Sequence, residues 1–239
     1  MKVEAIFISA VHLGSRGCNS VELLETLKKY DPEILFIVGD FIDGWLLKKR
    51  HYWKQSYNNV IRKILSYAKS GTRVVYITGN HDEFLRNYTP LNFDKNIQVV
   101  DNHIWNGYFI THGDVYDGVV SLRWLAILGS IGYELAISID RIIKKLGVKR
   151  SLSKWAKDSV KGAVKFITAF ETQLVFQAKE RGCNGVICGH IHKPEDKSIN
   201  GIHYLNCGDW IENNSYIVYN KGKFKIVFYE QNEYIKEKK

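Results

Sequence analysis

The feature that most constrains the fold is a series of short apolar runs, each ending where glycine, aspartate, asparagine and histidine gather. Five such junctions follow one another: Ser9-Ala10-Val11-His12-Leu13-Gly14, Gly39-Asp40, Gly79-Asn80-His81-Asp82, Thr111-His112-Gly113-Asp114 and Gly189-His190-Ile191-His192. Continuous apolar runs of this length are typical of strands buried on both faces. Sheets with parallel strands bind ligands at the carboxyl ends of the strands, and all five junctions fall there.

The segments between the junctions predict alternating strands and helices. Helices are expected at 21–30, ended by Asp31-Pro32, and at 56–69, ended by Gly71. Strands are expected at 3–9, 34–38, 73–77, 97–100, 108–111, 186–188, 203–206, 216–219 and 224–229. This alternation predicts an α/β fold whose sheet contains parallel strands. The length of 239 residues fits a single domain, 1–239.

A helical block at 119–179 separates the two halves of the strand pattern. Between 141 and 165 the chain has nine Lys or Arg and one acid, a local net charge of +8 within a total of +9. Five of these cations are spaced to form one stripe along a helix: Arg150, Lys154, Lys157, Lys161 and Lys165. Three interpretations of the stripe are open. It is a solvated charged face, part of a cap whose lysines contact substrate phosphates, or a surface that docks on anionic lipid.

Other features exclude several classes of protein. The longest apolar stretch, 122–139, carries Arg123 and Glu134, so no transmembrane helix is expected. The N-terminus shows no signal peptide. The four cysteines show no C-x-x-C spacing, which indicates reduced thiols in a cytoplasmic protein.

The side chains at the five junctions are potential metal ligands. Histidine, aspartate and asparagine suit Mn²⁺, Fe²⁺ or Zn²⁺. Two such ions roughly 3.5–4 Å apart can clamp a phosphoryl group. One carboxylate has to touch both ions, and Asp40, at the end of a buried strand, is the candidate. A single histidine would more often be a core or loop residue, but five junctions in one order argue against that interpretation.

The order D-x-H, G-D, G-N-H-[D/E], H and G-H-x-H resembles the calcineurin-like metallophosphoesterases, and the pattern runs from residue 10 to residue 192. The resemblance implies a four-layer α/β/β/α sandwich with 119–179 as a helical cap. It implies one metal ion bound by His12, Asp40 and His192. A second ion would be bound by Asp40, Asn80, His112 and His190.

The same resemblance implies roles for residues around the metals. His81 is expected to face the phosphoryl group and to protonate the leaving oxygen, and Asp82 is expected to orient His81. Four cations are candidates for contacts with substrate phosphates, with an ordinary surface position as the alternative for each: Arg86, Lys154, Lys157 and Lys161.

Within that family the chain resembles the group containing UDP-2,3-diacylglucosamine diphosphatase, which cleaves the pyrophosphate of a lipid A precursor. The resemblance is carried by the helical insert and by three motifs: His12-Leu13-Gly14, Gly39-Asp40-Phe41-Ile42-Asp43-Gly44-Trp45 and Gly189-His190-Ile191-His192-Lys193-Pro194. It implies Mn²⁺, an anionic nucleotide lipid as substrate and a place on the cytoplasmic face of the inner membrane. The chain departs from the group at His81, where those enzymes typically have Arg, and at Ala10, where the family has Asp.

Ala10 leaves one expected ligand missing, so the chain is expected to be inactive or impaired. A scaffold that had decayed into a non-catalytic binding protein would have lost several ligands, and only one is missing here. A single Asp-to-Ala change in a complete site therefore resembles an engineered inactivation more than natural drift. The alternatives are a one-metal variant, a hydrolase of soluble phosphodiesters, and a hydrolase of nucleic acid held by the basic stripe.

Overall fold

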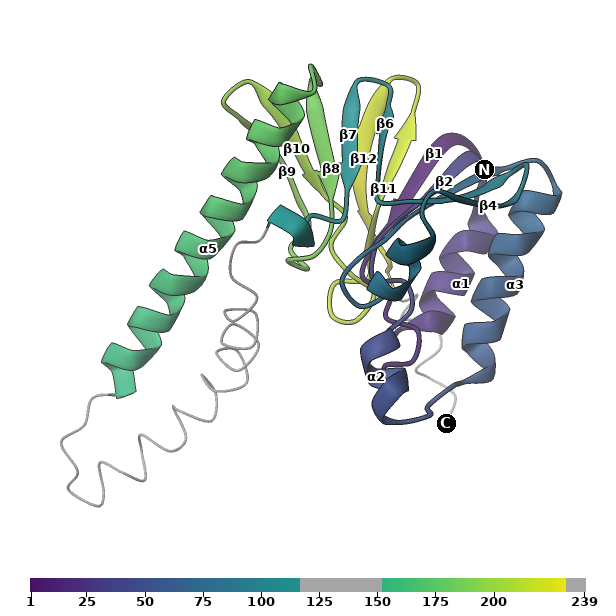
Figure 1. Ribbon diagram of the computed structural model, residues 1–239, viewed down its shortest axis with the longest axis horizontal. Helices are drawn as coiled ribbons and strands as arrows, with labels where there is room; N and C mark the ends of the chain where they lie inside the picture. The colour runs from purple at the N-terminus through teal and green to yellow at the C-terminus, as the bar shows by residue number, and fades with distance from the viewer. Residues whose placement is uncertain (117–151, 231–239) are drawn as a thin grey trace. The chain divides into compact units, whose positions relative to one another are not determined.

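The computed structural model describes residues 1–116 and 152–230, with only the backbone described for 152–161 and 163 (Figure 1). The chain forms two compact units, one made of Met1–Asp114 and Val175–Lys239, the other of Val115–Leu174. Both sheets belong to the first unit. In the described ranges, no helix combines the length and apolarity that a membrane crossing requires.

The first sheet has seven strands in the order β12-β11-β1-β2-β3-β5-β4. Its centre is parallel: β1 (Lys2–Ile8), β2 (Asp31–Val38), β3 (Arg73–Ile77) and β5 (Ile97–Val100). Antiparallel strands complete both sides: β11 (Ser215–Asn220), β12 (Lys223–Phe228) and β4 (Leu91–Asp94). The ends of β1 and β2 are buried without interruption, as expected of strands that are covered on both faces.

The second sheet has five strands in the order β6-β7-β8-β10-β9. They are β6 (Asn102–Trp105), β7 (Tyr108–Thr111), β8 (Gly185–Cys188), β10 (Ile202–Asn206) and β9 (Glu195–Ile199). The two sheets share one core, in which Phe7 and Phe36 of the first sheet cluster with Ile110, Ile187 and Leu205 of the second. Face-to-face packing of the two sheets therefore forms the middle of the unit.

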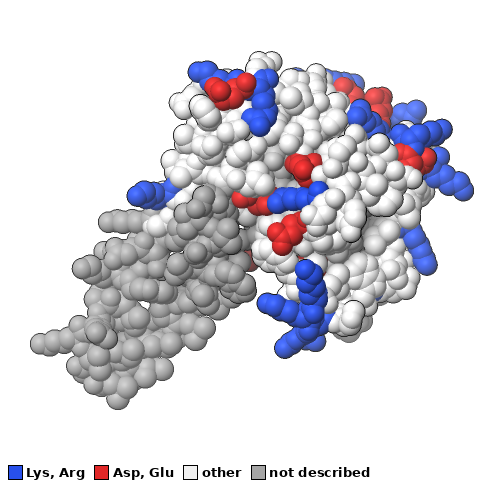
Figure 2. Space-filling model, viewed as in Figure 1, with Lys and Arg blue, Asp and Glu red and all other residues white. Residues whose placement is uncertain are grey.

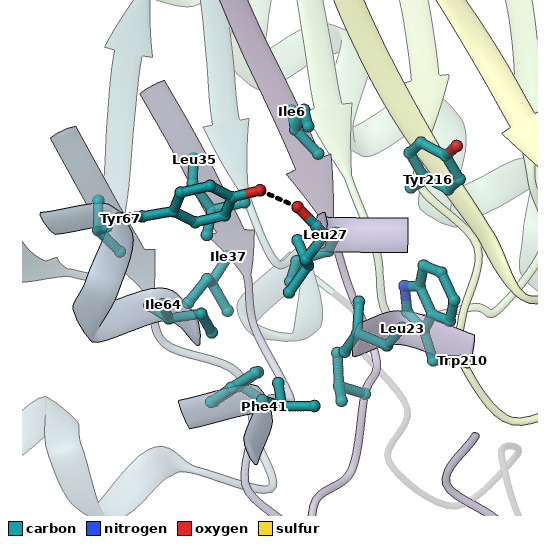
Figure 3. Packing of buried hydrophobic residues seen from close by; sticks show 14 of the residues in the cluster. Ile6, Leu23, Leu27, Leu35, Ile37, Phe41, Ile64, Tyr67, Trp210 and Tyr216 are labelled. Atoms are coloured by element: carbon teal, nitrogen blue, oxygen red, sulfur yellow. Dashed lines mark hydrogen bonds between the residues drawn. The ribbon is translucent and has the colours of Figure 1, made fainter. Parts of the chain in front are cut away.

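Helices α1 (Ser20–Lys29) and α3 (Gln55–Lys69) cover the outer face of the first sheet (Figure 1). Their apolar residues form a second core with that sheet, and Figure 3 shows Leu27 and Ile64 packed beside Ile37. The Tyr67 hydroxyl of α3 donates to the Leu27 carbonyl of α1, so a hydrogen bond also joins the two helices (Figure 3). On the second sheet, the Arg181 guanidinium lies 4.4 Å from the Phe109 ring, just after α5 (Leu152–Glu180) ends.

The expected two-sheet α/β sandwich is confirmed, as are the nine expected strands and the two helices. Three further strands, β4, β6 and β9, were not predicted, and each lies at the edge of its sheet. Three short helices were also not predicted: α2 (Gly44–Lys49), η1 (Glu83–Tyr88) and η2 (Asp114–Tyr116). Of the helical block expected at 119–179, residues 119–151 lie outside the described part, and α5 follows from Leu152.

Candidate metal centre

The candidate ligands lie in loops that follow β1, β2, β3, β7 and β8, at the carboxyl ends of these strands. The backbone of these loops is unusual, because five residues other than glycine adopt positive φ angles of 49–69° at the site: Ala10, His12, Asp40, His190 and His192. Such conformations cost on the order of 1–3 kcal/mol each and cluster at functional sites. Gly79 lies so close to Asp40 and His112 that a Cβ atom there would overlap both side chains.

The first set of candidate ligands is His12, Asp40 and His192, whose donor atoms all lie within 4.8 Å of one another. The Nε2 atoms of His12 and His192 face each other at 3.3 Å. Nε2 of His12 is also 3.7 Å from Oδ2 of Asp40. His12 and Asp40 are buried. This arrangement of two imidazole nitrogens and a carboxylate oxygen is suited to one divalent cation.

The second set is Asp40, His112 and His190, again within 4.8 Å and all buried. Nε2 of His112 lies 3.2 Å from Oδ2 of Asp40 and 3.3 Å from Oδ1 of Asn80. Nδ1 of His112 lies 3.0 Å from the Val38 carbonyl oxygen. A ring N–H on Nδ1 that donates to this carbonyl leaves Nε2 available as a ligand.

Asp40 is the residue that the two sets share, as the sequence analysis expected of a bridging carboxylate. Burial would raise the pKa of its carboxyl group, but the nearby imidazoles of His112, His12 and His81 hold that pKa well below its usual range. In turn, burial would lower the pKa of His112, but the Asp40 carboxylate raises it to about 9. The centre is thus built around a carboxylate that stays ionised although it is fully buried.

Asp43 is a site residue that the sequence analysis missed. Its Oδ2 lies 3.3 Å from Nδ1 of His12, and its Oδ1 lies 3.0 Å from Nδ1 of His81. The His81 contact is a close approach rather than a well-aligned hydrogen bond. Burial would raise the pKa of Asp43, but the two imidazoles lower it below its usual range. The Asp43 carboxylate therefore contacts both a candidate metal ligand, His12, and the candidate general acid, His81.

The sequence held a signal for Asp43. The residue stands directly before the helix α2 and caps it, because its side chain accepts a hydrogen bond from the Leu46 amide at 2.9 Å. Aspartate is a preferred residue at this capping position.

The structure gives Asp82 a different role from the expected one. Its carboxylate accepts hydrogen bonds from the Phe41 amide at 2.8 Å, from the Tyr76 hydroxyl at 2.6 Å and from the Gly79 amide. It therefore ties the loop after β2 to the loop after β3. Burial and the charge of Asp40 raise the pKa of Asp82. The carboxylate beside His81 is Asp43 rather than the expected Asp82.

His81 is enclosed by aromatic rings as well as by Asp43. The ring centroid of Trp45 lies 4.3 Å from that of His81, and the His12 ring meets His81 edge-on at 4.5 Å. The Trp45 indole is held in turn by a 3.1 Å hydrogen bond from its Nε1 to Glu83. These contacts restrict how the imidazole of His81 can turn.

The remaining candidate contacts to substrate are placed as follows. Arg86 forms an ion pair with Asp114 at 2.8 Å and donates to Thr78, so it links η1 to the loop after β7. The side chains of the other three candidates lie outside the described part of the chain: Lys154, Lys157 and Lys161.

Ala10 is fully buried between two other loops of the centre. Its amide donates to the Gly39 carbonyl at 3.2 Å, and its own carbonyl accepts from the Trp210 amide at 3.1 Å. The second contact belongs to a loop that sequence reasoning overlooked.

The overlooked loop, Gly208-Asp209-Trp210, follows β10 and repeats the glycine–aspartate pattern of the other junctions. The buried Asp209 carboxylate accepts from the amides of Ile211 and Glu212 and from the Asn213 side chain. Asn213 donates in turn to the His192 carbonyl at 2.9 Å. This loop therefore supports both Ala10 and His192.

Comparisons with known proteins agree with this geometry. The model of a family described as calcineurin-like phosphoesterase matches residues 7–194, which include all five junctions. No curated protein matched the chain.

Several solved structures are similar to the chain. The phosphoesterase Yfce from E. coli has 13% identity and a TM-score of 0.45, with 95% of this chain and 99% of that chain covered. A single mutant of Vps29 from Entamoeba histolytica has 12% identity and a TM-score of 0.46, with 95% and 99% covered. Nuclease MPE from Pseudomonas putida has 26% identity and a TM-score of 0.31, with 45% and 53% covered.

Proposed function

The chain belongs to the calcineurin-like phosphoesterase family, and we propose that it hydrolyses a pyrophosphate bond in a nucleotide lipid similar to UDP-2,3-diacylglucosamine. The single observation that carries the metal-dependent part is the sharing of the buried Asp40 by two sets of candidate ligands. The lipid part is supported by the motifs around His12, Asp40 and His190 and by the basic stripe in the insert.

The residues of the centre fit two divalent ions. The donors are four imidazoles, one shared carboxylate and one amide oxygen, a set that suits Mn²⁺, Fe²⁺ or Zn²⁺. We assign His12, Asp40 and His192 to the first ion. The second is assigned to Asp40, Asn80, His112 and His190, and Mn²⁺ is the proposed metal at both places. Bound there, such ions supply charge stabilisation at the phosphoryl oxygens and a water of lowered pKa.

His81 is the residue proposed to act on the leaving group. Asp43 and Trp45 hold its imidazole, so that the ring can donate a proton to the leaving oxygen without first being reoriented. Asp43 also contacts Nδ1 of His12, and Nε2 of the same ring faces His192. A single carboxylate thus positions both the proposed acid and one proposed ligand.

The insert is proposed to act as a cap over the substrate, with Lys154, Lys157 and Lys161 meeting phosphates. Arg86, which the structure pairs with Asp114, is proposed to support the rim of the site through that pair. The protein would then work at the cytoplasmic face of a membrane, where a nucleotide lipid is found. Nucleic acid is the less favoured partner.

Ala10 is proposed to weaken the first metal site, because that site lacks one anionic ligand. The decisive experiment compares the present chain with Ala10→Asp and Ala10→Asn. Hydrolysis of UDP-2,3-diacylglucosamine and of bis(4-nitrophenyl) phosphate is measured with Mn²⁺ and with a chelator. We expect Mn²⁺-dependent hydrolysis to rise strongly in Ala10→Asp only, because Asn has nearly the same shape without the negative charge.

Each part of the proposal can fail separately. If Ala10→Asp binds two metal ions but cleaves neither compound, the proposed hydrolysis is wrong. If it cleaves only the soluble diester, the lipid substrate is wrong. Equal metal content in the present chain and in Ala10→Asp would contradict the assignment of position 10 to the first ion.

A further inference from the structure

A second basic segment lies within the described part of the chain. Between Asp43 and Asp82 the sequence has no acidic residue at all. The same interval contains eight cations: Lys48, Lys49, Arg50, Lys54, Arg62, Lys63, Lys69 and Arg73. Its net charge of +8 equals that of the basic part of the insert, so the positive surplus has two sources rather than one.

Part of this segment, together with Arg16, which lies against Tyr52, forms a surface around α2, here called the α2 surface. It consists of Arg16, Leu46, Lys48, Lys49, Arg50, Trp53 and Lys54. Figure 2 shows Lys and Arg side chains gathered at the edge of the molecule where Figure 1 labels α2. The exposed side chains include two large apolar ones, Leu46 at 41% and Trp53 at 42% exposure.

The cations of the α2 surface have no acidic partner within the described part of the chain. Arg16 and Lys54 both lie against the Tyr52 ring, at 5.2 and 5.6 Å from its centroid. Within residues 1–116 and 152–230, no ion pair involves any of the five cations of this surface. Five positive charges around one short helix, without an acidic partner among the described residues, favour an anionic partner outside the chain.

We propose that the α2 surface docks this protein on an anionic lipid bilayer. Lysine and arginine would meet the lipid headgroups, and Leu46 and Trp53 would enter the interfacial layer, where tryptophan is enriched in membrane proteins. A nucleic acid would also attract the cations, but it offers no apolar layer for an exposed leucine. The lipid bilayer is therefore the partner that uses both kinds of side chain.

Docking through this surface would bring the candidate metal centre close to the bilayer. α2 begins at the centre, because Asp43 caps the helix and contacts His81, while the Trp45 ring of α2 lies tilted against His81. The helix has six residues, so its exposed side chains are about 9 Å or less along its axis from the centre. The inference rests on the membrane location in the proposed function and adds the surface that would bind there, and the binding itself does not depend on hydrolysis.

The test is co-sedimentation of the full chain with vesicles in the presence of EDTA, so that neither metal nor activity is involved. Vesicles of pure phosphatidylcholine are compared with vesicles containing phosphatidylglycerol. The charge variant is Lys48→Ala/Lys49→Ala/Arg50→Ala. Its matched control, Lys69→Ala/Lys223→Ala/Lys225→Ala, removes the same charge at exposed positions away from α2. A third variant, Leu46→Ser/Trp53→Gln, keeps every charge.

We expect binding to require phosphatidylglycerol and to weaken with salt. The charge variant should lose roughly 100-fold in partition coefficient, at about 1 kcal/mol for each basic residue near the surface, whereas the control should lose far less. Leu46→Ser/Trp53→Gln should bind more weakly than the unmodified chain at every salt concentration, because apolar burial is not screened.

Three results would overturn the proposal. The first is equal loss of vesicle binding in the charge variant and its control. The second is loss only when the insert lysines are replaced, in Lys154→Ala/Lys157→Ala/Lys161→Ala. The third is an oligonucleotide that binds more tightly than the vesicles and is released by the α2 charge variant. None of these results bears on hydrolysis, so failure here is distinguishable from failure of the proposed function.

Discussion

At the scale of single residues, the centre depends on two buried aspartates that have different tasks. Asp43 contacts the rings of His12 and His81, whereas Asp82 accepts hydrogen bonds from Phe41, Tyr76 and Gly79. The first task concerns the orientation of imidazoles. The second concerns the attachment of one loop to another. Replacing each carboxylate by an amide should therefore affect different properties.

In an Ala10→Asp background, we expect Asp43→Asn to lower hydrolysis or metal affinity by roughly 10- to 100-fold, the usual effect of losing the group that orients a ligand. Asp82→Asn should lower the free energy of unfolding by about 1–3 kcal/mol, because an NH₂ group would face a buried donor. Urea unfolding and hydrolysis rates measured on both variants separate the two tasks. The assignment is wrong if Asp82→Asn lowers the hydrolysis rate but not the free energy of unfolding, while Asp43→Asn lowers the free energy of unfolding but not the hydrolysis rate.

Position 10 should affect stability in a direction that depends on metal. An added carboxylate at this fully buried position would lie beside the Gly39-Asp40 loop and its charge. In EDTA we therefore expect Ala10→Asp to be less stable than Ala10→Asn by about 2 kcal/mol, within the range for an uncompensated buried polar or charged group. With excess Mn²⁺ the order should reverse, because a ligand that binds only the folded state stabilises it. Thermal unfolding with and without Mn²⁺ is the measurement, and an unchanged order would remove position 10 from the metal site.

Sequence reasoning found the candidate ligands but not their supports, and the reason is physical. Histidine and aspartate after apolar runs are visible as a pattern along the chain. Which carboxylate reaches which imidazole depends on how separate loops approach one another. Asp82 is next to His81 in sequence, yet its side chain points to the loop after β2. Asp43 is far from His81 in sequence and within 3.0 Å of it in space.

At the scale of elements, the central strands were predictable, whereas three of the four edge strands, β4, β6 and β9, were not. Central strands are buried on both faces, so they read as unbroken apolar runs. β9, by contrast, has the sequence Glu-Asp-Lys-Ser-Ile and alternates between half-buried and exposed positions. Charged residues on an edge strand discourage pairing with other chains, so they hide the strand from an apolar pattern. The short helix α2 has six residues, too few for apolar residues to recur at helical spacing. It was therefore not predicted from the sequence.

The contact between α1 and α3 gives an element-scale prediction. The Tyr67 hydroxyl donates to the carbonyls of Leu27 and Tyr30 at the end of α1. Tyr67→Phe should lower the free energy of unfolding by about 1–2 kcal/mol, because these carbonyls would lose their donor in a buried place. Tyr88→Phe is the matched control, since Tyr88 is exposed. Equal effects in denaturant unfolding would mean that the hydrogen bond does not join the helices in solution.

At the scale of the whole molecule, charge is distributed in two basic segments of equal net charge, one in the insert and one between Asp43 and Asp82. The first segment was predictable because its lysines have helical spacing. The second was not, because that interval is marked by a lack of acids rather than by a dense run of bases. Removing the α2 charges should therefore change association with anionic surfaces while the fold and the buried centre stay as they are.

The contact between His12 and His192 joins residues 180 positions apart in the chain. At synthesis rates of about 5–20 residues per second, His192 is added roughly 10–40 seconds after His12. His190, a ligand of the other set, is added at nearly the same moment. Neither set of candidate ligands can therefore come together before most of the chain has been synthesised. Metal binding at the proposed centre would therefore follow the synthesis of most of the chain, and the metal supply in the cell would act on a nearly complete protein.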